Sequence, residues 1–220
     1  MEITATPQRY VYNGKPQGQV GENLKNTADQ PLVNAIGLLP GHTISRVSID
    51  GTQRTEAGEY VDALTPKAIR VLDSAGRDVT DKYLLESTSG RPGTLIINPR
   101  GLGENADQPL MIKALDQTFV YTGKPQGDVG ANLQASADHP LVKVWGLVEG
   151  HGVRSVTITG ERQTARGVYA DSLMPSGARI MEEQGKDVTA NYILSAPGYL
   201  PGSLTIRGRA RFYKMAVHHA

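Results

Sequence analysis

The chain has 220 residues, a formal net charge of +1 from 23 basic and 22 acidic side chains, and no cysteine. This balance gives no long-range field for attracting nucleic acid or an anionic membrane, and the lack of cysteine excludes disulfides and thiolate metal sites. No apolar run reaches the roughly 18 to 20 residues that a membrane-spanning helix needs. We therefore expect a monomer without cofactor, nucleic-acid partner or membrane insertion.

The sequence repeats itself with an offset of 109 residues. The heptad YNGKPQG at Tyr12 returns as YTGKPQG at Tyr121, and the offset holds without a gap to Ile97 and Ile206. A repeat of this length predicts two domains, each of roughly 100 residues and long enough for its own core. The expected divisions are a first repeat at 1–98, a linker at 99–110, a second repeat at 111–207 and a basic tail at 208–220.

Short apolar runs between Gly, Pro, Asn and Asp predict short strands in the first half of each unit. Residues 3–12 are an expected entry strand, which the Gly-Lys-Pro-Gln-Gly segment ends. Residues 19–31 form a polar insert that we expect to be mostly loop, with at most one helical turn. Residues 32–39 are apolar enough for a buried strand. Residues 44–51 then predict a strand with one face inward from Val47 onward, closed by a tight turn at Asp50-Gly51.

The second half of each unit predicts a strand ending at Leu64 before Pro66, a separate strand at 69–72, and a closing strand. In the closing strand Ile96 becomes Thr205 in the second copy, so this position is expected to face solvent while its two neighbours face the core. About seven or eight strands per unit favour a mainly β protein with two tandem antiparallel β-sandwich domains of immunoglobulin-like type. A β-grasp-like α+β unit is the alternative.

Several motifs of Gly, Tyr, Pro and Asp recur at fixed spacing in both copies. They are Tyr12-x-Gly-Lys-Pro, Gly37-Leu38-x-x-Gly41, Ala57-Gly58-x-Tyr60, Gly76-x-Asp78-Val79-Thr80-x-x-Tyr83 and the closing Pro-Gly-[Thr/Ser]-Leu-x-Ile. Together they resemble the MBG-type (YDG-like) repeats of large bacterial surface and secreted proteins. The resemblance covers both units but not the tail, and this chain departs from it by a longer period and a longer insert at 19–31.

The resemblance implies a serial, non-catalytic module of an adhesin-like protein, exposed outside the bacterial cell. Such a module would serve as a stalk, spacer or adhesive unit, with a host or cell-surface glycan or protein as its partner. The chain would then be a fragment without its signal peptide and anchor. Tandem modules extend reach and multiply weak contacts.

Two repeated residue types are expected to be structural. Tyr60 and Tyr169 follow a Gly-x pair and resemble a tyrosine corner, in which the phenol hydroxyl bonds an upstream backbone group. His42 and His151 recur in equivalent turns, and neither has a second histidine or carboxylate close in sequence in both copies. We interpret them as turn histidines rather than metal ligands.

A calcium loop is a weaker candidate. Carboxylates around a glycine turn suit a hard cation, but the spacing differs from an EF-hand and a Lys or Arg lies inside the loop. We favour a hairpin turn in which an aspartate bonds its own backbone. The carboxylates concerned are Asp73, Asp78, Glu182 and Asp187.

The runner-up function is a carbohydrate-binding module. Its contact residues would be Tyr12, Tyr121, Lys15 and Lys124, or the insert at 19–31. The lysines also raise the alternative of an isopeptide crosslink, which needs a buried lysine. The closing strand ends in Asn98 in one copy and Arg207 in the other, which argues against a shared crosslink.

Two further residues have a simple interpretation. Trp145 replaces Ile36 in a strand expected to be buried, which predicts core packing rather than a sugar platform. Ser172 follows Asp171, but Ala63 stands at its place in the first copy, and no nucleophile elbow or phosphate loop is present. We therefore expect the chain to have no enzymatic activity.

Overall fold

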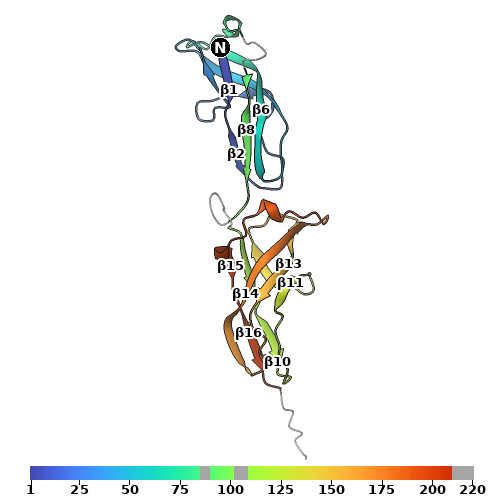
Figure 1. The fold of residues 1–220 in the computed structure, drawn as a ribbon. Coiled ribbons are helices and arrows are strands. Elements are labelled where there is room, and N and C mark those ends of the chain that lie inside the picture. Colours follow the sequence, from blue (N-terminus) through green and yellow to red (C-terminus); the bar gives the residue numbers. More distant parts are fainter. Residues whose placement is uncertain (85–89, 102–108, 210–220) are drawn as a thin grey trace, which may run out of the picture. The chain divides into compact units, whose positions relative to one another are not determined.

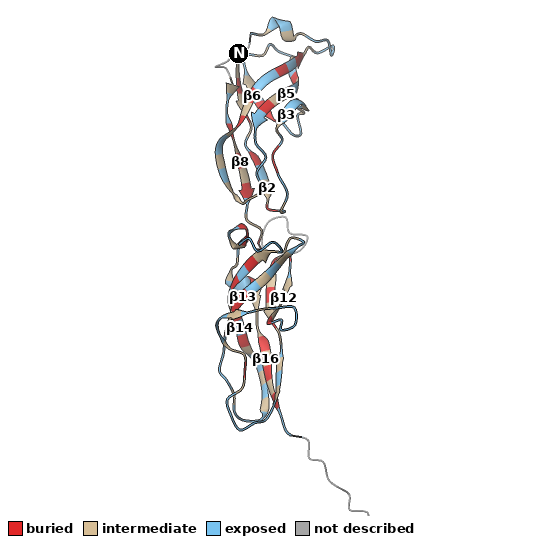
Figure 2. Ribbon diagram, turned by 90° about the vertical axis from the view of Figure 1, so that its right-hand side faces the viewer, coloured by how far each residue is buried: buried red, intermediate tan, exposed pale blue. Residues whose placement is uncertain are grey.

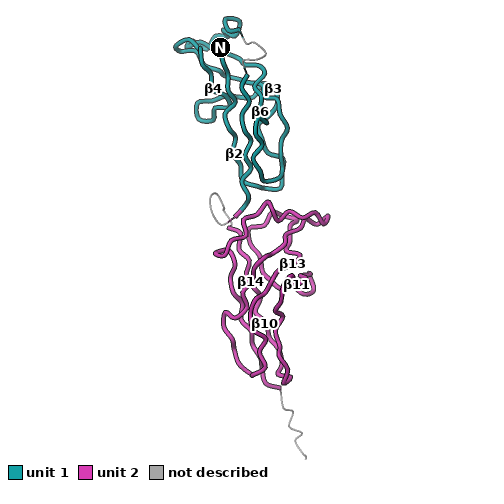
Figure 3. Tube along the Cα trace, viewed as in Figure 1, with its two compact units in different colours: residues 1–100 teal, residues 101–220 magenta. Residues whose placement is uncertain are grey.

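The computed structural model describes residues 1–84, 90–101 and 109–209 (Figure 1). The chain divides into two compact units, Met1–Arg100 and Gly101–Ala220 (Figure 3). Within the described ranges the elements are strands and short 3₁₀ turns, with no α-helix. The mainly β expectation is confirmed, and the α+β alternative is wrong. Most of the expected linker at 99–110 and of the tail at 208–220 lies outside the described residues.

The described part of the first unit contains two sheets that enclose one core. Its strands are β1 Glu2–Ala5, β2 Gln8–Val11, β3 Gly21–Lys25, β4 Val33–Ile36, β5 Thr43–Gly51, β6 Gly58–Leu72, β7 Gly90–Arg91 and β8 Gly93–Asn98, with a 3₁₀ turn η1 at Thr80–Lys82. A five-stranded sheet has the order β2-β8-β6-β5-β3, and a three-stranded sheet has the order β4-β1-β7.

The described part of the second unit repeats this arrangement. Its strands are β9 Met111–Ala114, β10 Gln117–Val120, β11 Gly130–Gln134, β12 Val142–Trp145, β13 His151–Thr159, β14 Gly167–Glu182, β15 Tyr199–Leu200 and β16 Gly202–Arg207, with η2 at Thr189–Asn191 and η3 at Ala196–Gly198. The sheet orders are β10-β16-β14-β13-β11 and β12-β9-β15. Both units are therefore β-sandwiches of one topology.

The core of each unit lies between its two sheets, and Figure 2 shows buried residues along the strands β8 and β16. In β8 the side chains of Leu95 and Ile97 are buried while Ile96 is half-buried, and Thr205 is half-buried in β16. The expected inward face of β5 is also present, because Val47 and Ile49 are buried. These period-two predictions are confirmed.

The expected entry strand is two strands rather than one. It breaks at Thr6-Pro7, so that β1 joins the three-stranded sheet and β2 joins the five-stranded sheet. Both strands have a parallel neighbour: β1 pairs with β7, and β2 pairs with β8. The remaining strand pairs of the first unit are antiparallel. The second unit has the two equivalent parallel pairs, β9–β15 and β10–β16.

The insert at 19–31 is mostly loop, as expected, but it contains a strand where a helical turn was the expected alternative. β3 occupies Gly21–Lys25 and pairs with β5 at the edge of the five-stranded sheet. Its register shifts between Gly21 and Leu24, where Asn23 adopts a positive φ of 57°. Asn132 in β11 has a φ of 50°. This irregularity interrupts the alternation of inward-facing and outward-facing residues, which is the pattern that identifies a strand from sequence.

β4 and β12 are edge strands with one exposed face, so the expectation of a buried strand was wrong for that face. Ile36 is 74% exposed, and Trp145 at the equivalent position is 39% exposed. The Nζ atom of Lys143 lies 5.1 Å from the centroid of the indole ring. Trp145 therefore packs on the surface of the second unit and not in its core.

The second half of the unit contains one long strand where two were expected. β6 runs from Gly58 through Pro66 to Leu72. Pro66 lies beyond Leu64, the last residue of β6 that pairs with β8, and a proline is tolerated where one side of a strand lacks a ladder partner. The tight turn expected at Asp50-Gly51 was also wrong, because Gly51 ends β5 and β6 begins only at Gly58.

Candidate functional site

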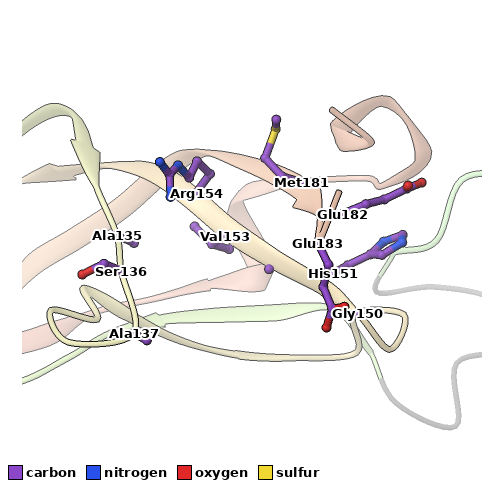
Figure 4. A pocket seen from close by; sticks show the side chains of 11 residues that line it. Ala135, Ser136, Ala137, Gly150, His151, Val153, Arg154, Met181, Glu182 and Glu183 are labelled. Carbon is purple, nitrogen blue, oxygen red and sulfur yellow. The ribbon is translucent and has the colours of Figure 1, made fainter. Parts of the chain in front are cut away.

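A cleft recurs at the same place in both units. In each unit the cleft has a volume of about 490 Å³. It lies between the loop after β3 and the beginning of β5 in the first unit, and between the loop after β11 and the beginning of β13 in the second. The second unit's cleft is drawn in Figure 4. The equivalent lining segments are 26–28 and 42–45 in the first unit, and 135–137 and 151–154 in the second.

The two clefts share these two segments, but the rest of their lining and its chemistry differ: the end of β14 lines the second cleft, and β4 lines the first. In the second unit Arg154 lies toward the loop that contains Ser136, while His151 and Glu182 lie toward the other end (Figure 4). Ser45 stands in the first unit where the second has Arg154.

The loop side of the cleft differs as well. Asn26 in the first unit donates from Nδ2 to the carbonyl of Ile44 at 3.0 Å, and its Oδ1 accepts from the N–H of Leu32 at 2.7 Å. Ala135 replaces it in the second unit. The second unit therefore lacks the side chain that, in the first unit, hydrogen-bonds the loop of the cleft to β5.

The repeated histidines are each paired with a tyrosine. Nδ1 of His42 lies 2.7 Å from the hydroxyl oxygen of Tyr83, which also accepts a hydrogen bond from the N–H of Leu39 at 3.1 Å. The second unit repeats the pair between His151 and Tyr192 at 2.7 Å. In both units the two rings meet edge to face. These histidines hold turns.

Sequence reasoning missed the tyrosine partner. The two members of the pair are 41 residues apart, so proximity along the chain gives no sign of it. The available signal was that both the histidine and the tyrosine recur at the same offset in both copies.

Asp73 closes a hairpin turn. Its carboxylate accepts hydrogen bonds from the N–H of Ala75 and the N–H of Arg77, each at 2.9 Å, and it pairs with the Arg77 guanidinium at 2.8 Å. The backbone hydrogen bond from Arg77 is the main reason that the pKa of Asp73 is lowered from its ordinary value. This is the turn chemistry that we favoured over calcium binding.

Asp78 and Asp187 hold the next turn in their units. Oδ1 of Asp78 accepts from the Thr80 hydroxyl at 2.6 Å and from the Thr80 N–H at 3.0 Å, and Oδ2 accepts from Nε of Arg70 at 2.8 Å. These bonds, led by the threonine hydroxyl, lower the pKa of Asp78 to about 2, and the pKa of Asp187 is likewise about 2. Both oxygens of each carboxylate thus accept hydrogen bonds, one from the threonine of the turn and the other from an arginine of the long strand β6 or β14.

The remaining calcium candidate, Glu182, lines the cleft of the second unit. Across the part of the chain that the structure describes, no group of three or more His, Asp or Glu side chains is arranged to hold a metal ion.

Each corner tyrosine reaches back to the backbone. The Tyr60 hydroxyl donates to the carbonyl of Glu56 at 2.9 Å, and the Tyr169 hydroxyl donates to the carbonyl of Ala165 at 3.1 Å. The Tyr60 ring folds over Gly58, where a Cβ would lie 3.4 Å from Cζ. A Cβ at that distance would be in ordinary van der Waals contact, so the ring packs directly over the glycine of the Gly-x-Tyr motif.

The candidate ligand residues of the heptad differ between the copies. Tyr12 is 1% exposed and has no ring face for stacking a sugar, whereas Tyr121 is 39% exposed. Lys15 and Lys124 are both exposed and therefore lack the burial that an isopeptide crosslink requires. The structure thus leaves Tyr121 as the accessible tyrosine of the pair.

A different heptad residue has a clear structural role that sequence reasoning missed. Nε2 of Gln17 donates to the carbonyl of Val11 at 3.2 Å, and the backbone of Gln17 exchanges two hydrogen bonds with that of Arg54. Nε2 of Gln126 donates to Val120 in the same way at 3.0 Å. The signal was the recurrence of the glutamine in both heptads.

Ser172, the weak candidate nucleophile, donates its hydroxyl proton to the carbonyl of Tyr169 at 2.8 Å.

Comparison of the chain with protein-family models, with curated proteins and with solved structures finds no match. Among the described residues, no helix has the length and apolar character needed to cross a membrane.

Proposed function

We propose that the chain is a non-catalytic tandem module of a bacterial secreted or cell-surface protein of the adhesin-like, MBG-type class. It serves there as a stalk or spacer, or as an adhesive unit. The observation that carries the proposal is that polar residues recurring at equivalent positions hold turns and strands together. The pairs His42–Tyr83 and Asp78–Thr80, and the Tyr60 hydroxyl, are examples.

The pattern of repetition supports a mechanical or spacing role over a chemical one. The two copies share strand order and register, so the fold is what the repeat preserves. The cleft, in contrast, exchanges a serine for Arg154 and Asn26 for an alanine. A duplicated binding or catalytic function would require the lining side chains to be alike.

Surface labelling tests the proposed location directly. Antibodies raised against the purified chain should label intact, unpermeabilised cells of the source organism, or detect the protein in its culture medium. Labelling that appears only after the cells are permeabilised, with none of the protein in the medium, would contradict the proposal. An antibody against a cytoplasmic protein is the control for cell integrity.

A carbohydrate-binding module is the second candidate, and one observation favours it. The end of the insert lines the cleft in both units, and the second unit also exposes Tyr121 and Trp145. Glycan-array screening followed by titration of the intact chain tests this function. Saturable binding that is lost in Arg154→Ser or Tyr121→Ala, but kept in the control Arg9→Ser, would establish it; no binding by the intact chain would exclude it for the glycans tested.

A further inference from the structure

A strand near the beginning of each unit lies beside the unit's last strand and runs in the same direction. Figure 1 shows β2 alongside β8. Gln8 lies opposite Leu95 and Val11 lies opposite Asn98, and a bond of 2.9 Å from the N–H of Tyr12 to the carbonyl of Asn98 extends the pair. β10 and β16 repeat this parallel pairing in the second unit.

This direction of pairing determines how the unit responds to tension along the chain. The chain reaches the pair at the beginning of β2 and leaves it at the end of β8, and in a parallel pair these two points lie at opposite ends. Pulling on the chain therefore slides the strands past each other and loads the evenly spaced ladder bonds together. β1 and β7 form a second parallel pair with the same geometry, in which Ile3 lies opposite Gly90.

Glutamine side chains hold β2 at both of its ends. At the first residue of the strand, Gln8 donates from Nε2 to the carbonyl of Gln19 at 3.1 Å and accepts at Oε1 from the N–H of Gln19 at 2.6 Å. At the last residue, Nε2 of Gln17 donates to the carbonyl of Val11. Gln8 and Gln17 are both buried, so water competes little for these bonds.

The second unit repeats these glutamine hydrogen bonds, here called latches, with side chains that are half-buried and not buried. Gln117 exchanges two hydrogen bonds with the backbone of Asp128, at 3.1 and 2.7 Å, and Gln126 donates to the carbonyl of Val120. The heptad also packs against the last strand, because a Cβ on Gly18 would lie 3.2 Å from Cδ2 of Leu95. The most similar stretch of the two copies thus fastens the strand that tension would pull.

We propose that the parallel pairs β2–β8 and β10–β16, latched by Gln8, Gln17, Gln117 and Gln126, form a shear clamp with which each unit carries tension along the chain. The inference deepens the proposed stalk role and rests on that role for its biological meaning. Forced unfolding is governed by the unfolding barrier, so resistance to force is a property separate from equilibrium stability.

Force spectroscopy in two directions tests the clamp. Because the chain contains no cysteine, engineered cysteines can serve as unique attachment points. Pulling from the two termini loads both units in shear. Pulling between Thr122→Cys and Arg209→Cys, just beyond the ends of β10 and β16, peels the same pair apart from one end. The unfolding force should be several-fold higher in shear; comparable forces in the two directions would overturn the clamp.

A latch variant tests the glutamines within one molecule, since the unaltered second unit is the internal reference. Gln17→Met should weaken one of the two unfolding events under terminal pulling. The control is Tyr83→Phe, chosen from a network outside the clamp, which should lower chemical stability without lowering the force. An equal loss of force in both variants would overturn the role of the latch. Either failure would leave the surface role standing, because labelling of intact cells tests it independently.

Discussion

The hydroxyl oxygen of Tyr83 lies 2.7 Å from Nδ1 of His42, and the same hydroxyl accepts the N–H of Leu39. Tyr83, the residue directly after η1, is therefore joined to the turn at 39–42, which lies 41 residues earlier in the chain. The equivalent contact between His151 and Tyr192 has the same length. This repeated contact is the basis of the first prediction.

Removing the hydroxyl should destabilise the unit that contains it. Tyr83→Phe and Tyr192→Phe each leave a backbone N–H and an imidazole nitrogen without this partner, which should lower the free energy of unfolding by about 1–2 kcal/mol. Urea unfolding followed by circular dichroism measures the change. Tyr121→Phe, at an exposed tyrosine, is the control and should change little. An unchanged midpoint in Tyr83→Phe would show that the contact contributes nothing.

Acid should destabilise each unit through the turn aspartate that both copies share, Asp78 in the first unit and Asp187 in the second. The pKa of Asp78 in the folded unit is about 2, below the ordinary value of 3.8, so its carboxylate stabilises the fold above about pH 4 and this contribution disappears as the pH falls toward 2. Asp187 acts in the same way. Asp78→Asn should therefore be less stable at pH 6 and should lose less further stability between pH 4 and pH 2.

Denaturant midpoints measured from pH 6 to pH 2 provide the comparison. Asp29→Asn, an exposed position outside these turn networks, is the matched control and should keep the parent slope. The same acid slope in Asp78→Asn and in the parent chain would show that the turn does not cause the dependence.

The corner tyrosines should contribute equally to their two units. Tyr60→Phe and Tyr169→Phe each remove one hydrogen bond to an upstream carbonyl, and each should cost about 1 kcal/mol of unfolding free energy. Chemical unfolding of the single variants and of the double variant measures this. A double-variant loss smaller than the larger single loss would be inconsistent with two separate corners.

Trp145 should be replaceable, although tryptophan is usually costly to lose from a core. Trp145→Ile introduces the residue found at the equivalent position of the first unit, and since the side chain is partly exposed the stability should change by less than about 0.5 kcal/mol. Thermal unfolding followed by circular dichroism measures it. A loss of about 3 kcal/mol or more would restore the interpretation of a core tryptophan.

The parts of the fold that could be predicted were those where two copies constrain each other. The exchange of Ile96 for Thr205 identified the outward position of the closing strand, because only a solvent-facing site accepts both residues easily. The offset of the repeat likewise predicted two units before any element was assigned.

The parts that could not be predicted depend on contacts distant in sequence or on local rules that tertiary pairing overrides. A proline within an apolar run usually indicates the end of a strand. Pro66 nevertheless lies within β6, at a position where β6 has no pairing with β8. The partner of His42 was hidden by the 41 residues between it and Tyr83. The cleft also depends on which loops the fold brings together, and no local motif records that.

The positive φ of one asparagine in each of the edge strands β3 and β11 has a consequence for solubility. A chain that carries the same edge strand twice keeps two matching rows of free N–H and C=O groups at high local concentration, which favours pairing between copies and aggregation. The positive φ of Asn23 and Asn132 interrupts each row. Replacing either asparagine with a β-branched residue would straighten the edge and make association between neighbouring molecules easier.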